Sequence, residues 1–259
     1  MITIKKNNYY SEIIFTKSKN NDYNENENTE NENIENENIE NNTPRDYLNE
    51  SLMRSKRLIL DYALNNNFNY FVTFTFDSSK INRSNFNSCK NKILKALNNF
   101  KNRYDSEFKY ILVPELHSNG IAIHFHGLIF TSNMDFLKRL YFSKDYFTNV
   151  YRHDFFFNRF GANCFIPIIN SSERVAFYIT KYISKSNVRV FSNSYFVSKG
   201  LNRSTTLISS NLKEFKDFII DNVLQNSRPS FYNDFVVKYK ISFDDLNKFY
   251  KNECKLLDN

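Results

Sequence analysis

The sequence predicts an α+β fold, in which an antiparallel sheet is flanked by helices. Two observations predict it. Segments with strand character are interspersed with segments whose apolar residues recur at helical spacing, which indicates a mixed architecture. Two strand-like segments, 109–117 and 121–130, are separated by only Ser118, Asn119 and Gly120. Asn-Gly between apolar runs is the strongest short signal of a β-hairpin, so the sheet is built around an antiparallel pair.

The other elements follow from periodicity and from turn residues. Helices are expected where apolar residues recur every three or four positions, and they are predicted at 46–65, 87–104, an aromatic-rich stretch 134–151, 171–185 and 211–225. Besides the hairpin, strands are predicted at 69–76, 164–168, 195–197 and near 235–241. Strands and helices are therefore mixed along the whole chain.

The second strand of the hairpin contains two histidines, His124 and His126. Alternate residues of a strand point to the same face with Cα atoms roughly 7 Å apart, so both imidazoles can reach one metal ion. If Asn119 and Gly120 form the turn, paired residue numbers sum to 239, and Glu115 lies directly opposite His124. A one-residue slip would move Glu115 to the other face. His117 lies on the same face, one pair nearer the turn, and is a further candidate.

Two imidazoles and a carboxylate predict a metal site open to a substrate. These donors suit zinc, manganese or another borderline ion, whereas magnesium usually prefers more oxygen. A structural zinc site would need a fourth ligand, commonly a thiolate, and Cys89, Cys164 and Cys254 form no CxxC pair. A lone histidine in a strand is more often an ordinary half-buried side chain, but the carboxylate and the second imidazole favour a catalytic metal.

A second group of polar residues lies on the helix predicted at 171–185. Tyr178, Lys181, Tyr182 and Lys185 are spaced i, i+3, i+4 and i+7, so two phenols and two ammonium groups share one helical face. The alternative is a solvated face of long side chains, because tyrosine and lysine are common in this chain. A phenol, with a pKa of about 10, is a poor nucleophile at neutral pH. A nearby cation or metal ion would stabilise the phenolate anion. The histidine–carboxylate group and the tyrosine–lysine group together therefore suit covalent attack on a phosphodiester.

With these two groups of residues, the sequence resembles the HUH endonucleases, specifically the two-tyrosine initiators of rolling-circle replication in phages and plasmids. Three motifs carry the resemblance, in the order of the family: the strand Tyr70–Phe76, the pair His124-Phe-His126, and Tyr178-Ile-Thr-Lys181-Tyr182-Ile-Ser-Lys185. The resemblance covers about residues 68–205. It implies an RRM-like antiparallel sheet with the metal site on the face opposite the packed helices.

The resemblance also implies an activity and its residues. It implies a metal-dependent nuclease and strand transferase that nicks and rejoins single-stranded DNA at a replication origin through a 5′-phosphotyrosine. Glu115, His124 and His126 would hold a divalent metal, Mg²⁺ or Mn²⁺. Tyr178 and Tyr182 would be the nucleophiles, and Lys181 and Lys185 would orient or neutralise the phosphate. No GxxxxGK[ST] motif is present, so a host helicase is expected to unwind the duplex and a host polymerase to extend the 3′ end.

The charge distribution agrees with a nucleic-acid partner. The chain has a net charge of +7, but residues 20–42 contain eight acidic and no basic side chains. The other 236 residues hold 35 Lys and Arg against 20 Asp and Glu, a net charge of +15 that suits a phosphate backbone. The 17% of aromatic residues could stack on unpaired bases, although a genome rich in A and T would also raise this fraction.

The predicted domain organisation is simple. Residues 1–42 form an N-terminal segment that includes the acidic Asn/Glu-rich stretch, expected to be a disordered linker because it is almost devoid of apolar residues. Residues 43–259 form the endonuclease domain with a C-terminal extension of helix and strand. With no signal-peptide pattern, no apolar run of membrane-spanning length and only scattered cysteines, we expect no membrane partner and a bacterial cytoplasm.

Two alternatives remain open at this stage. A non-catalytic module that binds single-stranded DNA or RNA would have a similar basic and aromatic composition, but it has no need of Glu115, His124 and His126 on one face. A single-strand transposase of the same superfamily would share the chemistry, and chain length and motif order disfavour it only slightly.

Overall fold

The computed structural model describes the greater part of the chain: residues 1–16, 44–117, 120–169, 172–185, 194–210, 217, 219–221, 224, 227–232, 236–245 and 247. The acidic segment predicted as a linker lies outside the described residues, and so does most of the helix predicted at 211–225. The chain forms two compact units. One comprises residues 47–203, and the other combines 1–46 with 204–259. Each is described by itself.

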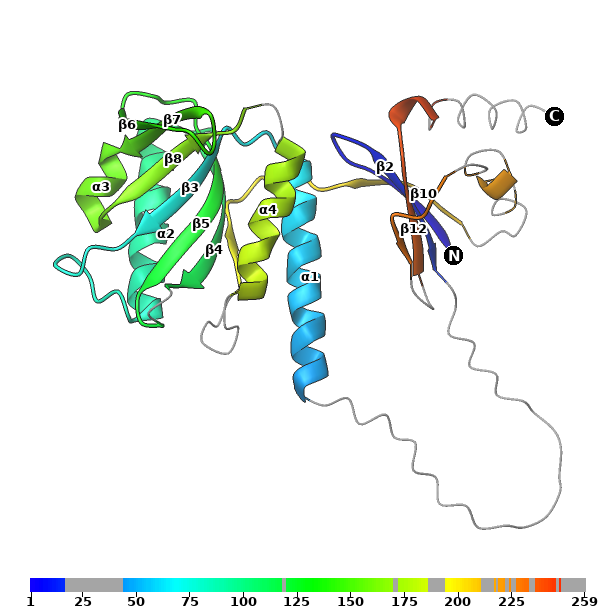
Figure 1. Cartoon of the computed structure of the whole chain (residues 1–259), viewed down its shortest axis with the longest axis horizontal. Coiled ribbons are helices and arrows are strands. Elements are labelled where there is room, and N and C mark those ends of the chain that lie inside the picture. The colour runs from blue at the N-terminus through cyan, green and yellow to red at the C-terminus, as the bar shows by residue number, and fades with distance from the viewer. Residues whose placement is uncertain are drawn as a thin grey trace, which may run out of the picture. The chain divides into compact units, whose positions relative to one another are not determined.

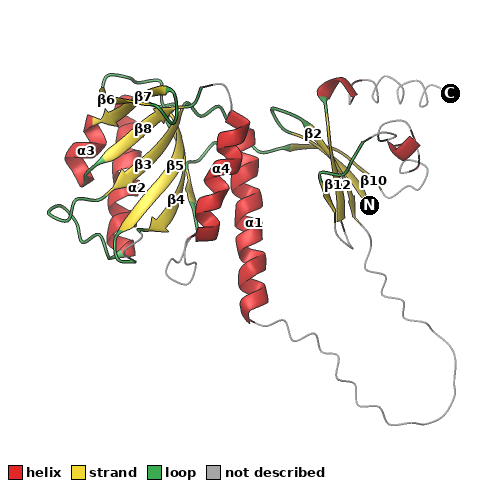
Figure 2. Ribbon diagram, in the orientation of Figure 1, coloured by secondary structure: helices red, strands yellow, loops and turns green. Residues whose placement is uncertain are grey.

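The larger unit is built on a seven-stranded antiparallel sheet (Figure 1). In spatial order its strands are β6 (Leu137–Ser143), β7 (Thr148–His153), β8 (Asn163–Pro167), β3 (Tyr70–Thr75), β5 (Ile123–Phe130), β4 (Lys109–Leu116) and β9 (Phe196–Val197). Its helices are α1 (Pro44–Leu64), α2 (Phe86–Tyr104), α3 (Asp154–Phe160) and α4 (Ser172–Lys185). Figure 2 shows the helices lying around the sheet. The predicted α+β class is confirmed.

The two faces of the sheet have different partners, which the alternation of side chains on β3 makes clear. On one face, Val72 and Phe74 join a large aromatic core with α2 and α3, in which Phe74 contacts Phe156 at 5.5 Å between ring centroids. On the other face, Phe71 contacts Tyr178 of α4 at 5.5 Å. Helix α4 therefore packs on the face that also carries the paired histidines of β5, while α2 and α3 cover the opposite face.

Most of the predicted elements of this unit are confirmed. Helices α1, α2 and α4 and strands β3, β4, β5, β8 and β9 match predicted segments within two or three residues. The hairpin has the predicted register, with Glu115 paired with His124 and Val113 with His126, while Asn119 of the predicted turn lies outside the described residues. Pro114 is accommodated opposite Phe125 without a shift in the register of this pair of strands.

The helical prediction for 134–151 is wrong. This stretch forms the β6–β7 hairpin, with Leu137 paired with His153 and Ser143 with Thr148, and α3 begins only at Asp154. Nearly all of β6 is exposed, so the strand lacks the apolar alternation by which a half-buried strand is recognised. Its conformation is decided instead by pairing with β7, which in turn pairs with β8 through Tyr151 and Phe165.

The smaller unit contains a five-stranded antiparallel sheet formed by both ends of the chain. Its strands, in spatial order, are β10 (Thr205–Ser210), β1 (Ile2–Lys6), β2 (Ser11–Thr16), β12 (Val236–Ile241) and β11 (Phe231–Tyr232). The N-terminal strands, which the sequence did not predict, occupy the centre. Ile4 and Ile13 pack there with Ile219 and Leu224 in a small apolar core. The C-terminal extension, predicted as part of the endonuclease domain, thus shares a sheet with the N-terminal segment. The only one of its strands predicted from sequence, near 235–241, is confirmed as β12.

No helix among the described residues combines the length and the apolar character that crossing a membrane requires.

Candidate active site

The histidine pair is positioned by the two strands that flank β5. On one side, β4 brings Glu115 opposite His124. On the other side, β3 brings Thr73 opposite His126 and Thr75 opposite His124. Directly opposed residues of an antiparallel pair share a face, so three strands place two imidazoles, a carboxylate and two hydroxyls on the same surface.

The carboxylate contacts the second histidine rather than the one directly opposite it. Glu115 Oε2 lies 2.7 Å from His126 Nε2, which is a diagonal contact across the hairpin. His124 instead packs against His117, with 4.9 Å between ring centroids. As a result, no three His, Cys, Asp or Glu side chains within the described part of the chain are gathered closely enough to form a metal cluster. The strands bring the predicted ligands together, and the side chains are engaged with one another.

The two threonines of β3 orient the imidazoles. Thr73 Oγ1 lies 3.1 Å from His126 Nδ1, and Thr75 Oγ1 lies 3.4 Å from His124 Nδ1. A hydroxyl at Nδ1 restrains the ring and selects its tautomer, and Nε2 is then the nitrogen through which a metal would be held. The pKa of His124 is lowered, first by burial and then by the positive charges of His117 and Arg83. A neutral imidazole is the form that can coordinate a metal.

Helix α4 carries the predicted tyrosine–lysine face. Its apolar residues Ala176, Ile179 and Ile183 are fully buried and fix the rotation of the helix on the sheet. The two tyrosines are consequently different: the side chain of Tyr178 is 39% exposed and that of Tyr182 only 9%.

The two phenols form one hydrogen-bonded pair beside the histidines. The Tyr182 hydroxyl donates to the Tyr178 hydroxyl at 2.9 Å. The Tyr182 ring stacks on His126 with 4.0 Å between centroids and an interplanar angle of 18°. Phe71 supports both tyrosines, at 5.5 Å from Tyr178 and 6.1 Å from Tyr182. The tyrosine helix and the histidine strand, about 50 residues apart in sequence, thus meet in direct contact.

The environment of Tyr182 keeps it protonated. Its pKa is raised, first by burial, then by its hydrogen bond to Tyr178 and by the neighbouring charge of Glu115. A phenol that retains its proton acts as a hydrogen-bond donor, which is the role Tyr182 has toward Tyr178. The more exposed phenol is therefore the acceptor of the pair, and negative charge on its oxygen would be stabilised by this hydrogen bond.

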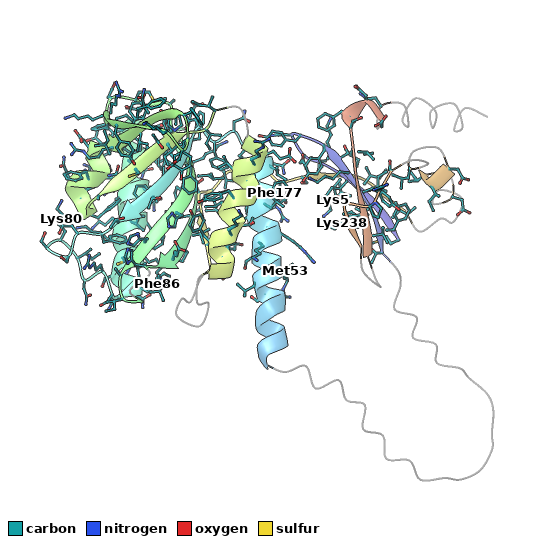
Figure 3. The ribbon with its side chains drawn as sticks, viewed as in Figure 1. Lys5, Met53, Lys80, Phe86, Phe177 and Lys238 are labelled. Atoms are coloured by element: carbon teal, nitrogen blue, oxygen red, sulfur yellow. The ribbon has the colours of Figure 1, made fainter. Side chains whose placement is uncertain are left out.

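Of the two lysines of the motif, only Lys181 has a side chain among the described residues. The Lys181 side chain is exposed, and its Nζ lies 5.4 Å from the centroid of the Tyr178 ring, within the range of a cation–π contact. Lys185 is the last residue of α4, and its side chain lies outside the described residues. Exposed Phe177 is the neighbour of Tyr178 on the same helix (Figure 3).

The chemistry of the side chains at this site, rather than their present contacts, suits a divalent cation. The structure contains a carboxylate in contact with the Nε2 atom of one imidazole, a second imidazole directly opposite that carboxylate, and hydroxyls that orient both rings. Oxygen and imidazole donors of this kind suit manganese, zinc or a similar ion, and the oriented rings provide the outer support that such sites need. Glu115, His124 and His126 are the residues that would hold it.

No role was predicted for Phe71, Thr73 and Thr75 from the sequence. The sequence nevertheless indicates that they share a face of the sheet, because on β3 they alternate with Tyr70, Val72 and Phe74, which face the core. Alternation alone does not identify the partner strand, so their contacts with the site follow only from the pairing of β3 with β5.

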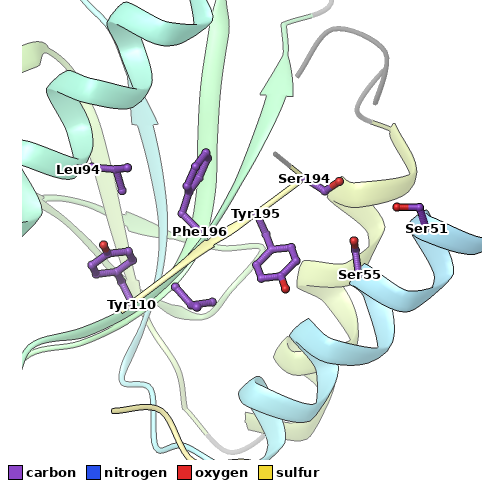
Figure 4. A pocket seen from close by; sticks show the side chains of 8 residues that line it. Ser51, Ser55, Leu94, Tyr110, Ser194, Tyr195 and Phe196 are labelled. Atoms are coloured by element: carbon purple, nitrogen blue, oxygen red, sulfur yellow. The ribbon is translucent and has the colours of Figure 1, made fainter. Parts of the chain in front are cut away.

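A separate cavity of about 530 Å³ lies at the β9 edge of the same sheet. Ser51 and Ser55 of α1 border it together with Tyr110 and Tyr195 (Figure 4). None of the predicted site residues lines it, so it is distinct from the tyrosine–histidine site.

Comparisons with known proteins give one match. No curated protein and no solved structure matches the chain. A family model does match, over residues 69–187, a segment that begins just before β3 and contains Glu115, both paired histidines and both tyrosines. That family is described as replication-associated protein ORF2, and the chain thus carries a segment similar to this family, which is consistent with an initiator of rolling-circle replication.

Proposed function

We propose that this protein initiates rolling-circle DNA replication by nicking and rejoining single-stranded DNA at a replication origin. The observation that carries the proposal is the contact between the tyrosine pair of α4 and the histidine of β5, with 4.0 Å between the rings of Tyr182 and His126. A non-catalytic binding module has no use for a hydrogen-bonded phenol pair against an imidazole and a carboxylate. The similarity of residues 69–187 to replication-associated proteins supports the same conclusion.

In the proposed reaction, Tyr178 is the first nucleophile. Its oxygen forms a bond to the scissile phosphorus, the bond from phosphorus to the 3′ oxygen breaks, and the electron pair goes to that oxygen. The phenol loses a proton and the 3′ oxygen gains one, so the products are a 5′-phosphotyrosine and a free 3′-hydroxyl. The hydroxyl of Tyr182 donates to the attacking oxygen, as it does to Tyr178 in the structure.

The other residues of the site bind and orient the phosphate. A divalent metal held by Glu115, His124 and His126 would supply polarisation of the phosphoryl oxygen when bound. Lys181, above the Tyr178 ring, and Lys185 supply positive charge to the phosphate. To close a circle, Tyr182 would attack the regenerated origin, forming a second 5′-phosphotyrosine and releasing a new 3′-hydroxyl. That hydroxyl would then attack the phosphorus bonded to Tyr178, the bond from phosphorus to the Tyr178 oxygen would break, and the phenol would regain a proton. We propose that the reaction occurs in the cytoplasm of a bacterial host, with a host helicase and polymerase.

The test is formation of a covalent protein–DNA adduct. The full chain is incubated with Mn²⁺ and a set of overlapping single-stranded oligonucleotides that cover the DNA flanking its coding sequence. We expect one oligonucleotide to give an adduct that survives SDS, with release of the fragment bearing the 3′-hydroxyl. Tyr104→Phe, a change on α2, which covers the opposite face of the sheet, serves as the control and should form the adduct normally. Binding of the oligonucleotides with no adduct under any divalent metal would refute the proposal and favour a non-catalytic binding module.

A further inference from the structure

A cavity of about 650 Å³ lies directly beside the tyrosine pair and has no role in the chemistry described above. Phe71 and Tyr178 line it, so it is continuous with the candidate active site. Asp145 and Tyr146, from the turn between β6 and β7, and Arg174, from the first turns of α4, also line it. A volume of a few hundred Å³ is the usual size of a pocket that encloses a small organic group.

The β6–β7 hairpin next to this cavity exposes an unusual number of aromatic rings. Tyr141, Phe142, Tyr146 and Phe147 are all more than half exposed, and Phe147 is 82% exposed. Phe147 also has a positive φ of 47°, a conformation that costs energy for a bulky residue and that glycine or asparagine would adopt more easily. Neither burial nor backbone preference explains a phenylalanine at this position, and its exposed ring is accessible to a ligand.

Tyr146 connects the hairpin with the active site. Tyr146 lines the cavity together with Tyr178. The pKa of its phenol is raised, first by partial burial and then by the neighbouring phenol of Tyr178. A flat group inserted in the cavity would therefore lie against Tyr146. The next group of the same bound polymer would then reach Tyr178. Rings that are exposed and adjacent to a nucleophile are suited to stacking on unpaired bases.

The polar residues of the cavity complement the two ends of a nucleotide. The guanidinium of Arg174 matches a phosphate, with which arginine forms paired hydrogen bonds. The carboxylate of Asp145 accepts hydrogen bonds, and the exocyclic amino group of a base donates them. The two groups therefore complement each other. Thymine has no exocyclic amino group, whereas cytosine, adenine and guanine have one.

We propose that this cavity binds one unpaired base of the DNA strand next to the scissile phosphate, by stacking on Tyr146 and by hydrogen bonding to Asp145. Phe147 stacks on the following base, and Arg174 contacts the phosphate between them. The subsite thus selects a base with an exocyclic amino group over thymine. This inference rests on the proposed function, since it names how the single-stranded substrate is held beside Tyr178.

The experiment measures binding of the full chain to fluorescein-labelled dC15 and dT15 at pH 8 by anisotropy. Tyr146→Ala and Phe147→Ala should each weaken binding of dC15 about five- to hundredfold, the range observed when one stacking ring is removed. Tyr146→Phe keeps the ring and should bind nearly normally. Leu140→Ala, an exposed residue without a ring on the same hairpin, should also bind normally. Asp145→Asn should reduce the preference of the protein for dC15 over dT15.

A second readout reports stacking itself. A single 2-aminopurine in an oligo(dT) strand loses fluorescence when it stacks on an aromatic ring. Wild type and Tyr146→Phe should quench it, and Tyr146→Ala should not. Normal binding and quenching by Tyr146→Ala and Phe147→Ala, or an equal loss in Leu140→Ala, would overturn the subsite. If these variants bind normally while the wild type forms the covalent adduct, only the subsite fails. If the variants behave as expected but no adduct forms with any flanking DNA, only the nicking activity fails.

Discussion

At the scale of single residues, the two tyrosines of α4 have distinct environments although they belong to one motif. Tyr178 is partly exposed and accepts a hydrogen bond, and Tyr182 is buried, stacked on His126, and donates that bond. The phenol that solvent and DNA can reach is thus the one whose oxygen is stabilised by a neighbour. In the proposed reaction, this asymmetry favours Tyr178 as the nucleophile of the first cut and Tyr182 as its hydrogen-bonding support.

Removing each phenol oxygen separately tests this assignment. Tyr178→Phe keeps the ring but removes the nucleophile, so we expect single-turnover cleavage to fall at least about 100-fold, with no adduct. Tyr182→Phe removes only a hydrogen bond to the attacking oxygen, so the first cut should slow by about tenfold and circularisation should fail. The double variant should form no adduct. An adduct mapped by mass spectrometry to a tyrosine outside α4 would contradict the assignment.

The predicted metal ligands are tested by comparing four variants. Glu115→Gln, His124→Ala and His126→Ala should each reduce nicking by more than about 100-fold with little change in thermal stability, because an open site contributes to chemistry more than to folding. Mn²⁺ should raise the melting temperature of the wild type but not that of the three variants. His117→Ala should retain most activity. Nicking that persists in EDTA, or a variant of His117 as inactive as the others, would show a different ligand set.

His153 is a buried histidine with an entirely different environment from the pair in β5. Its side chain is 0% exposed, and neither ring nitrogen has a hydrogen-bond partner among the described residues. Its ring lies 4.5 Å from that of Phe156 and 5.2 Å from that of Phe165. Burial lowers the pKa of this imidazole to about 3, so it is neutral in the folded protein at physiological pH.

This environment predicts that His153→Phe stabilises the protein. The change replaces two unsatisfied buried nitrogens by carbon, which should raise the free energy of unfolding by about 1–3 kcal/mol. In the wild type the unfolded chain binds a proton below about pH 6.5 and the folded chain does not. Stability is therefore lost as the pH falls from about 6.5 toward 3, by up to about 1.4 kcal/mol per pH unit, and the variant should lack this contribution. Urea unfolding at pH 7.5 and pH 5 measures both effects; a destabilised variant would indicate an unrecognised partner for the ring.

At the scale of elements, the close pairing of β4 with β5 positions the site, and it depends on one small residue. Gly127 follows His126, and a Cβ at this position would overlap the backbone carbonyl oxygen of Ile111 and a methyl group of Leu112. A backbone atom within a sheet cannot move aside without breaking the pairing that places Glu115 near His126. The identity of residue 127 thus controls the geometry of the proposed metal ligands.

Gly127→Ala should lower the free energy of unfolding by about 2–4 kcal/mol, because overpacking against a fixed backbone is among the more costly core changes. Nicking should fall with it. Gly120→Ala is the matched control: its φ of +70° makes alanine unfavourable by roughly 1–2 kcal/mol, but a Cβ there meets no atom within 4 Å. Chemical denaturation compares the two, and equal losses would show that overlap across the hairpin is not the cause.

At the scale of the whole molecule, charge is distributed unevenly. Residues 20–42 hold seven glutamates and one aspartate in a chain whose remaining residues have a net charge of +15. Acidic groups near a basic surface compete with the phosphates of DNA, and such competition is screened by salt. The strands β1 and β2, in contrast, are the central strands of the smaller sheet, so the N-terminal segment is not a single dispensable unit.

Neutralising the acidic segment without changing its length separates these two contributions. Replacing all seven glutamates of this segment by glutamine should leave nicking intact and raise the affinity for single-stranded DNA at low salt, by about three- to tenfold, with the difference disappearing near 0.5 M salt. Deletion of residues 1–42 should instead destabilise the smaller unit, because β10 and β12 lose their partners. Titration of labelled oligonucleotides at several salt concentrations provides the measurement. Weaker binding after neutralisation would mean that the segment contacts DNA favourably.

The sequence by itself determined the hairpin that carries the site. Asn119-Gly120 and the alternation around His124 and His126 specify a register in which Glu115 faces the histidines, because a turn and a two-residue period leave one arrangement that buries the apolar face. Likewise, the spacing of Tyr178 and Tyr182 determined that both phenols lie on one helical face. These are local consequences of backbone geometry, which adjacent residues decide.

Only the tertiary structure decided the contacts between segments distant in the sequence. The stacking of Tyr182 on His126, the diagonal contact of Glu115 and the support from β3 depend on which strands pair and on how α4 is rotated. The β6–β7 hairpin, which the sequence suggested was helical, and the sheet that joins the two chain ends depend on partners far along the chain. Periodicity reports which face of an element is apolar but not which element covers it. Long-range pairing therefore decided the environment of each residue of the candidate site.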